Sequence, residues 1–358
     1  MYLGIGLGIT RLSGVLGFNP ASLFANGEEG AWYDPSDLST LYQTATGTTP
    51  VTAAGQPVGL MLDKSKGGLS ATELVDAFTL GTGWTYAGGV LSCDGSTSNQ
   101  SATETTNATS GQYYLVTFDV NHVSGLMQVR TGDTFVATIG SSGVRTYIIK
   151  AAAASSIIRF TATTPAFTGT IDNISVRELP GNHATQSSSA KRPILQSSGG
   201  LYYLDFDGAD DWMRTTFGAA QAQPNTIAAA LKFDQGSRNE FVVDGVSTDR
   251  NAIYKTTTDL QLFAGSSITD PSAAGTTELV ALGHLNTTSS ELRVDGSQVV
   301  TGDVGSNQWG GVTLGADSSD TLWLDGRIYG FVGVNRTLTA GEIDDVESYL
   351  AAKSGVTL

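Results

Sequence analysis

The stretch Gly326-Arg-Ile-Tyr-Gly-Phe-Val-Gly-Val334 decides the fold class of this chain. Between Ile328 and Val334, apolar side chains occupy positions that fall on both faces of an extended strand. Such a pattern is typical of a strand that is buried on both sides. The stretch therefore predicts a strand that lies centrally in a β-sandwich.

A helix is expected directly after this strand. Thr339-Ala-Gly-Glu342 has the form of a capping box, in which the first and fourth side chains bond the free backbone N–H groups at a helix start. The apolar residues that follow share one helical face: Ile343, Val346, Tyr349 and Leu350. Gly355 suits the left-handed residue that ends many helices, so the sequence predicts one short C-terminal helix.

The segment from Leu69 to Leu179 has the pattern of β-strands. Apolar and polar side chains alternate from Tyr114 to Val120, which is the period of two that a half-buried strand requires. Further strands are expected at Met127–Arg130, Thr134–Ile139, Thr146–Lys150, Ile157–Ala162 and Thr170–Arg177. Ser70-Ala-Thr-Glu73 also has the form of a capping box, but we expect this segment to be an extended entry strand.

Strands continue from Pro180 to the closing helix. Asp295-Gly296 separates two apolar runs and favours a tight hairpin, because both residues accommodate a positive φ. Strands about ten residues apart with Gly and Ser between them indicate sandwiches. We therefore predict an all-β chain with two β-sandwich (jelly-roll) domains.

Composition limits the function. The 358 residues include 19 Lys+Arg and 34 Asp+Glu, a net charge of −15, so binding to nucleic acid is excluded by repulsion. The single cysteine, Cys93, excludes an intrachain disulfide, and three histidines argue against a His-rich metal site. No apolar stretch reaches the roughly 20 residues that a membrane-spanning helix needs, so membrane insertion is not expected.

The C-terminal half of the chain resembles concanavalin A-like sandwiches of the laminin G type. The stretches that carry this resemblance are Leu204–Trp212, Leu292–Gly296 and Gly326–Ile343. They reflect packing more than chemistry. The resemblance implies a sandwich of two sheets.

The middle of the chain resembles carbohydrate-binding modules with the galactose-binding jelly-roll fold. Phe167–Glu178 is similar to their final strand, and Thr82-Gly-Trp84 with Gly88–Ser92 is similar to their opening strands. The resemblance implies a structural Ca²⁺ held by Asp172 with help from Asp76, because this ion prefers oxygen donors. The alternative is that Asp172 caps a turn or bonds the neighbouring strand.

Two N-terminal stretches, Ser22–Ser39 and Thr48–Lys64, resemble openings that recur in virion proteins of tailed phages and prophages. In those proteins Asp-Lys-Ser is followed closely by Gly-Asn-His-Ala-Thr-Gln. Here Asp63-Lys-Ser65 and Gly181–Gln186 carry the two motifs, and a long segment separates them.

This separation predicts that one domain is inserted into the other. Residues 68–180 are expected to form the jelly roll, and residues 30–67 and 181–358 the discontinuous laminin G-like sandwich. A jelly roll with neighbouring ends can replace an exposed loop at small entropic cost.

Residues 1–29 are expected to form an N-terminal arm that attaches the protein to other virion proteins of the capsid or tail. Met1–Arg11 does not have the form of a secretion signal, because no basic residue precedes its apolar stretch and Arg11 interrupts it. An apolar, Gly-rich segment of this kind orders only against another surface, and plain disorder is the alternative.

A sugar site needs a flat aromatic side chain beside hydrogen-bonding groups, because the C–H faces of a pyranose are apolar and its hydroxyls are not. The candidates are Trp84 and Tyr86 in the inserted domain, and Trp212 and Trp309 in the larger one. Gly and polar residues surround Trp309, which indicates an exposed loop. Core packing is the alternative for each, since strand aromatics usually fill sandwich interiors.

Catalysis is not expected, and no catalytic residue is predicted. Asp207, Asp210 and Asp211 flank a turn, where Asp is a routine residue, and no Gly-x-Ser-x-Gly nucleophile motif is present. His183 is expected to make a structural hydrogen bond.

Together these observations predict a structural protein of the virion, of tail fibre, head fibre or spike type, assembled in the host cytoplasm. We expect a homo-oligomer that binds host-surface polysaccharide through many weak sites. One alternative is a capsid or tail decoration or cement protein without ligand binding. A second alternative is a polysaccharide depolymerase.

Overall fold

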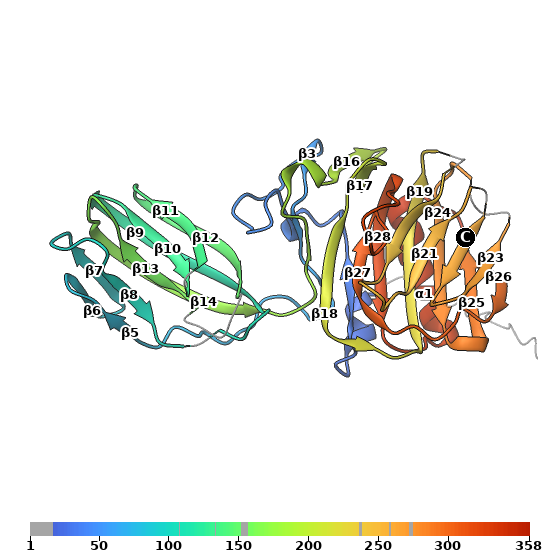
Figure 1. The fold of residues 1–358 in the computed structure, drawn as a ribbon, viewed down its shortest axis with the longest axis horizontal. Coiled ribbons are helices and arrows are strands. Elements are labelled where there is room, and N and C mark those ends of the chain that lie inside the picture. The colour runs from blue at the N-terminus through green and yellow to red at the C-terminus, as the bar shows by residue number, and fades with distance from the viewer. Residues whose placement is uncertain are drawn as a thin grey trace, which may run out of the picture.

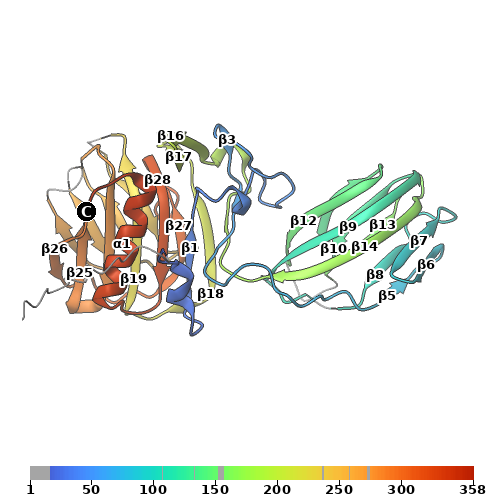
Figure 2. The ribbon, with the colours of Figure 1, turned by 180° about the vertical axis from the view of Figure 1, so that it is seen from behind.

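The computed structural model describes residues 17–106, 108–132, 134–151, 157–235, 238–257, 259–271 and 275–358. These residues form two lobes of unequal size, joined by two segments of chain that run side by side (Figure 1). Figure 2 shows the same lobes from behind, with the single α-helix of the described residues against the larger one.

The larger lobe is a sandwich of two sheets whose strands pair in antiparallel fashion. The first sheet runs in the order β26 (Ser297–Gly302), β25 (Ser290–Val294), β24 (Leu279–Leu285), β19 (Asn225–Phe233), β28 (Asp325–Val334), β17 (Leu201–Asp207), β16 (Ile194–Ser198) and β3 (Gln56–Pro57), with β1 (Gly30–Tyr33) also paired to β28. The second sheet runs in the order β2 (Leu41–Tyr42), β4 (Leu60–Met61), β15 (Ala184–Thr185), β18 (Met213–Gln221), β27 (Trp309–Leu314), β20 (Glu240–Asp244), β21 (Ala252–Lys255), β22 (Leu260–Phe263) and β23 (Ser267–Asp270).

The stretch Gly326–Val334 belongs to β28, which lies between β19 and β17, so its predicted central position is confirmed. Its Phe331 is buried in the core between the two sheets. Tyr329 and Val332 are buried on the opposite face, where they pack with residues of α1 (Ala340–Ser354) and of the 3₁₀ helix η1 (Pro20–Phe24). A helical layer, not a third sheet, therefore covers the outer face of this strand.

The capping box and the C-cap of α1 are confirmed. The Thr339 hydroxyl accepts a hydrogen bond from the Glu342 backbone N–H, and the Glu342 carboxylate accepts one from the Thr339 backbone N–H. Gly355 has a φ of 77°, which is the left-handed conformation that ends the helix. The hairpin at Asp295-Gly296 is also confirmed, with φ values of 46° and 78°.

The smaller lobe is a second sandwich with its own core, and within the described residues its strands pair only with one another. One sheet has the order β11 (Thr134–Ile139), β10 (Met127–Thr131), β13 (Arg159–Ala162), β8 (Ser101–Glu104) and β5 (Phe78–Leu80). The other has the order β12 (Gly143–Lys150), β9 (Tyr113–Ser124), β14 (Thr168–Leu179), β7 (Val90–Asp94) and β6 (Trp84–Ala87).

The predicted fold class is therefore confirmed: the chain is all-β apart from short helical segments, and one sandwich interrupts the other. The chain leaves the larger sandwich after β4 and returns at β15, which pairs directly with β4. The remaining helical segments are single 3₁₀ turns: η2 (Leu38–Thr40), η3 (Ser189–Lys191) and η4 (Thr287–Ser289).

The two segments that link the lobes are bonded to each other. Ser70 N–H donates to the Glu178 carbonyl at 2.9 Å, and Leu74 N–H donates to the Val176 carbonyl at 2.9 Å. The capping-box motif at residues 70–73 forms no helix, as expected, because the Glu73 carboxylate accepts from Val176 N–H at 2.7 Å. The segment is held extended beside β14 instead.

The predicted arm falls partly outside the described residues, which begin at Gly17. Within the described part, Leu23 and Phe24 of η1 are 1% and 5% exposed and pack with residues of α1. This part of the N-terminal segment therefore belongs to the larger lobe. No helix among the described residues has the length and hydropathy to cross a membrane.

Candidate functional site: the cleft between the lobes

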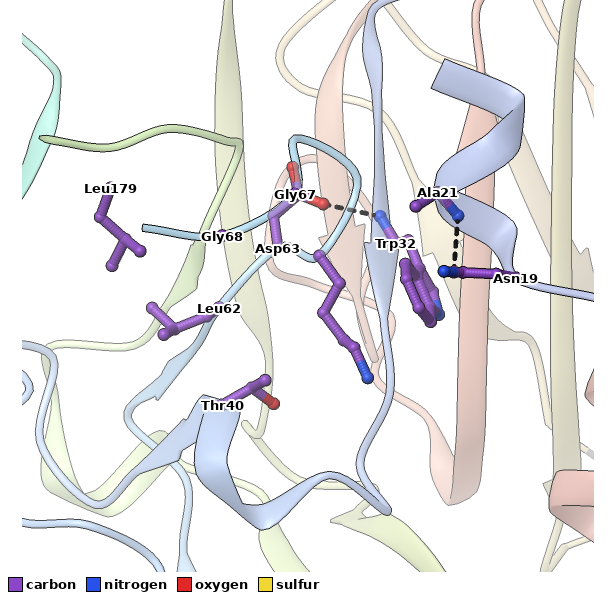
Figure 3. Close-up of a pocket in the computed structure, with 10 residues that line it drawn as sticks. Asn19, Ala21, Trp32, Thr40, Leu62, Asp63, Gly67, Gly68 and Leu179 are labelled. Carbon is purple, nitrogen blue, oxygen red and sulfur yellow. Dashed lines mark hydrogen bonds between the residues drawn. The ribbon is translucent and has the colours of Figure 1, made fainter. Parts of the chain in front are cut away.

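The junction between the lobes is organised around the carboxylate of Asp63. It accepts hydrogen bonds from the backbone N–H groups of Trp32 at 2.9 Å, Ser65 at 2.8 Å and Asn182 at 2.8 Å, and from the Ser65 hydroxyl at 2.8 Å. Figure 3 shows the carboxylate of Asp63 directed at the Trp32 backbone. Burial raises the pKa of Asp63, and these four donors act against that rise.

His183 completes the junction from the returning segment. Its Nδ1 accepts from Asp63 N–H at 2.9 Å, so Nε2 carries the proton that is donated to the Leu179 carbonyl at 3.1 Å. Burial lowers the pKa of His183 to about 4, which keeps the ring neutral. The expectation that His183 has a structural role is confirmed. The motifs that include Asp63 and His183 lie 120 residues apart in sequence, and they meet here.

A small apolar cluster seals the contact between the lobes. It consists of Leu60 from β4 and of Tyr113, Ile148 and Leu179 from the inserted sandwich. These four side chains are at most 7% exposed. The contact positions the inserted lobe against the second sheet of the larger one.

A hollow of about 350 Å³ lies beside Asp63, between η1 and the segments that link the lobes (Figure 3). Its polar side chains already have partners within the protein. Lys64 bonds both Asp34 at 3.3 Å and Asp37 at 2.7 Å, and its ammonium lies 4.5 Å from the centre of the Trp32 ring. The hollow therefore offers few unpaired groups with which to recognise a polar ligand.

On the other side of the junction, a cleft separates the larger lobe from the end of β12. It contains two adjoining hollows of about 250 and 260 Å³, which share Lys150, Thr215 and Thr216. Each is close to the lower end of volumes typical of small-ligand sites, about 300 Å³.

One wall of the cleft is the start of β18. Trp212, Arg214 and Thr216 are spaced by two residues, and successive side chains of a strand point to opposite faces. Met213 and Phe217 on the other face are buried in the sandwich core. The three side chains in register therefore face outward into the cleft, where Trp212 is partly exposed and Thr216 is exposed.

Arg214 is held in place by several bonds. Its Nε donates to the Thr313 hydroxyl at 2.8 Å, and its Nη2 donates to the Asp320 carboxylate and to the Ser318 carbonyl at 3.3 Å. The guanidinium carbon lies 4.7 Å from the centre of the Trp212 ring, which is a cation–π distance. These contacts fix the indole and the guanidinium relative to each other.

The inserted lobe contributes the opposite wall. Lys150, the last residue of β12, is exposed, and its ammonium lies 5.2 Å from the centre of the Tyr113 ring. Thr185 from β15 and Ser187 also line the cleft and carry hydroxyl groups. The arrangement combines an aromatic side chain, two cations and several hydroxyls in one hollow.

Of the four predicted aromatic residues, only Trp212 lines this cleft. The interpretation of Trp309 as an exposed-loop residue is wrong. It is 0% exposed because it begins β27 and packs edge-on to Phe217, with ring centres 4.8 Å apart, inside the sandwich core. The glycines that follow it belong to the strand, not to a loop.

The two candidates in the inserted lobe also lie in or against its core. Trp84 is 5% exposed, stacks on Phe167 with ring centres 6.2 Å apart, and donates from Nε1 to the Gln100 carbonyl at 3.0 Å. It therefore offers no open face to a sugar, and the alternative of core packing holds for it. Tyr86 is partly exposed and packs edge-on to Phe78 at 5.0 Å.

The predicted calcium ligands lie in different parts of the inserted lobe. Asp172 belongs to β14, pairs with Asp119 of β9, and accepts from Asn173 N–H at 2.7 Å. Asp76 precedes β5 of the other sheet. Among the described residues, neither belongs to a group of three ligating side chains, so side chains alone do not build a calcium site here. Calcium binding stays a prediction.

The group of this kind found among the described residues is Asp207, Asp210 and Asp211. Burial, with a contribution from Asp207, raises the pKa of Asp211 to about 7. Asp207 also accepts from Ala209 N–H at 2.9 Å, which is the turn-forming role that the sequence indicates. None of the three lines the cleft.

Lys150 and Arg214 were not predicted as site residues from the sequence. A signal for Arg214 was present, because a spacing of two from Trp212 places both on one face of a strand. No local signal identifies Lys150, because it reaches the cleft only through the packing of the two lobes.

Comparison with family models finds no match. No curated protein matches the chain either. Among solved structures, the receptor-binding domain of botulinum neurotoxin D matches with a TM-score of 0.36 and 10% identity, over 49% of this chain and 54% of that one. Trypanosoma rangeli sialidase in complex with the inhibitor DANA matches with a TM-score of 0.36 and 10% identity, over 74% of this chain and 61% of that one.

The chain thus spans about half the length of the botulinum neurotoxin domain that it matches. Similarity at this level does not bear on what this chain binds.

Proposed function

We propose that this chain is a structural protein of a tailed-phage virion that binds host-surface glycans in the cleft between its two sandwiches. The observation that carries the glycan part is the outward row Trp212, Arg214 and Thr216 opposite Lys150. No chemical step is proposed, and the protein is not expected to be an enzyme.

The physical basis is the two-sided chemistry of a sugar ring. The indole of Trp212 is partly exposed and lines the hollow, and the Arg214 guanidinium stacks on its ring and holds it in place. Thr185, Ser187 and Thr216 line the same hollow, and their hydroxyl groups suit the hydroxyls of a pyranose. A shallow site of this kind binds weakly, and many copies on one particle raise the overall affinity.

The virion part rests on the N-terminal motifs. These motifs resemble openings of phage virion proteins. A structural observation adds to this resemblance: the Asp63 N–H of one motif donates to His183 Nδ1 of the other at 2.9 Å. This contact supports the view that an ancestral sandwich kept its junction when the second sandwich was inserted. We propose attachment through the N-terminal segment and a homo-oligomeric state.

A glycan array of bacterial surface oligosaccharides tests the binding. We expect wild-type protein to bind a subset of glycans and Trp212→Ala to lose about fivefold to tenfold in affinity, which corresponds to about 1–1.5 kcal/mol, the upper part of the range for an aromatic contact. Phe135→Ala is the matched control, because Phe135 is 53% exposed on β11, outside the cleft, and its loss is expected to change nothing.

Absence of binding to every glycan, together with binding to purified virions, would instead support a decoration or cement protein. Equal binding by wild type and Trp212→Ala would show that the cleft is not the site. Electron microscopy of the intact particle tests the virion assignment, which fails if the polypeptide is absent from the map.

A further inference from the structure

We infer that the cleft selects a saccharide that carries a carboxylate, such as a uronic or sialic acid unit. This inference rests on the proposed glycan binding and specifies its ligand class. The observation behind it is the charge of the lining: the two hollows contain Lys150 and Arg214 and no Asp or Glu. The chain as a whole has 34 acidic and 19 basic residues. The positively charged lining of the cleft therefore differs from the negative net charge of the molecule.

Lys150 supplies the unpaired charge. Among the described residues, no carboxylate oxygen lies within 4.0 Å of its ammonium, whereas Lys64, Lys232 and Lys353 each pair with an Asp at 2.7–3.3 Å. It is exposed and lines both hollows. An anion entering either hollow therefore meets this ammonium.

Arg214 supplies directional hydrogen bonding. Its Nε and Nη2 donate to Thr313, Asp320 and carbonyl groups, while Nη1 donates to no acceptor within the described part of the chain. Because its Nε and Nη2 are already bonded, the guanidinium loses little conformational entropy when it donates to a further oxygen. Its charge is largely balanced by Asp320, so it orients a ligand more than it attracts one.

The sum of these charges limits the ligand. Arg214 with Asp320 is close to neutral, and Lys150 leaves a single positive charge. One carboxylate per recognised sugar unit balances it. A polyanion with several charges per unit gains nothing further in the cleft and is repelled by the net charge of −15.

The test pairs each ligand with its uncharged form. Capsular oligosaccharides are printed on one array in the native, carboxylate-bearing form and in the carboxyl-reduced form, and both are titrated with wild type, Lys150→Gln and Arg145→Gln. Arg145→Gln is the matched control, because Arg145 lies on the same strand, outside the cleft, and its replacement makes the same change in charge.

We expect wild type and Arg145→Gln to bind native forms about fivefold or more tightly than reduced forms, as for a charge-assisted hydrogen bond. Lys150→Gln is expected to bind both forms equally, at the level of wild type on the reduced form. Equal binding of both forms by wild type, or tighter binding of the reduced form, overturns the inference and leaves glycan binding intact. Binding to neither form overturns both.

Discussion

Burial acts on single carboxyl groups of the larger lobe, and Asp211 is the clearest case. Its pKa is raised to about 7 by burial and by Asp207, whereas an unfolded chain has a value near 3.9. The folded state therefore disfavours the carboxylate, and this group makes the protein less stable as the pH rises from about 4 to 7.

Asp211→Asn is expected to remove that dependence. The free energy of unfolding of the variant, minus that of wild type, should increase by about 2 kcal/mol or more between pH 4 and pH 8, measured by urea denaturation. The difference between variants is needed because His183, with a pKa lowered to about 4, and Glu240, with a pKa raised to about 7, titrate in the same window. Asp345→Asn, an exposed acid on α1, is the control, and a flat difference for Asp211→Asn would contradict the prediction.

The fates of Trp212 and Trp309 show what sequence can tell at this scale. Composition around Trp309 indicated a loop, yet the tertiary fold needs a large side chain at the start of β27, in the core. Trp212 alternates with Met213, and the parity of the strand places it on the outer face. The alternation of side chains along a strand shows which residues share a face, but not which face points into the core. Local composition does not identify the inward face.

Among the elements, α1 has the clearest local determinants. Thr339→Ala is expected to lower the free energy of unfolding by about 1 kcal/mol. The substitution removes the hydroxyl that accepts from the Glu342 backbone N–H and donates to the Glu342 carboxylate, which also pairs with Arg336. Chemical denaturation measures this loss. Thr339→Ser keeps the hydroxyl and should restore most of it, so equal losses for the two variants would argue against the cap.

Most strand positions were predictable because the period of two is a local signal. The predicted strand at residues 134–139 matches β11, and the strand predicted at residues 146–150 lies within β12. Strand order was not predictable in the same way. The β1 strand pairs with β28 across nearly the whole chain, and such a contact depends on the global core and leaves no mark in the local pattern.

At the scale of the whole molecule, the insertion makes a specific prediction. The two linking segments lie side by side, with Ser70 N–H bonded to the Glu178 carbonyl at 2.9 Å, and each lobe has its own core. We expect residues 68–180 expressed alone to fold, and the remainder, closed by a short Gly linker, to fold as well. Circular dichroism and thermal melting of both pieces check this.

Without the inserted lobe, Leu60 of the remainder loses the apolar side chains that cover it and becomes exposed. A second version of the remainder therefore carries Leu60→Ser, which replaces the exposed apolar side chain by a polar one. Failure of both pieces to unfold cooperatively would show that the lobes form one folding unit. The boundaries at 67/68 and 180/181 remain predictions until these pieces are made.

The insertion itself was predictable, because a motif interrupted in sequence signals an interrupted fold. The cleft was not, since Lys150 and Trp212 come from different lobes and meet only through the apolar contact around Ile148. Sites that arise between domains depend on how the domains dock, which no single segment encodes.

The most direct measurement is a crystal structure of the protein with an array-selected acidic oligosaccharide bound. We expect the sugar ring to lie in the cleft against Trp212, with its carboxylate within hydrogen-bond distance of Lys150. A sugar bound elsewhere on either lobe, with this cleft vacant, would contradict the assignment of the glycan site.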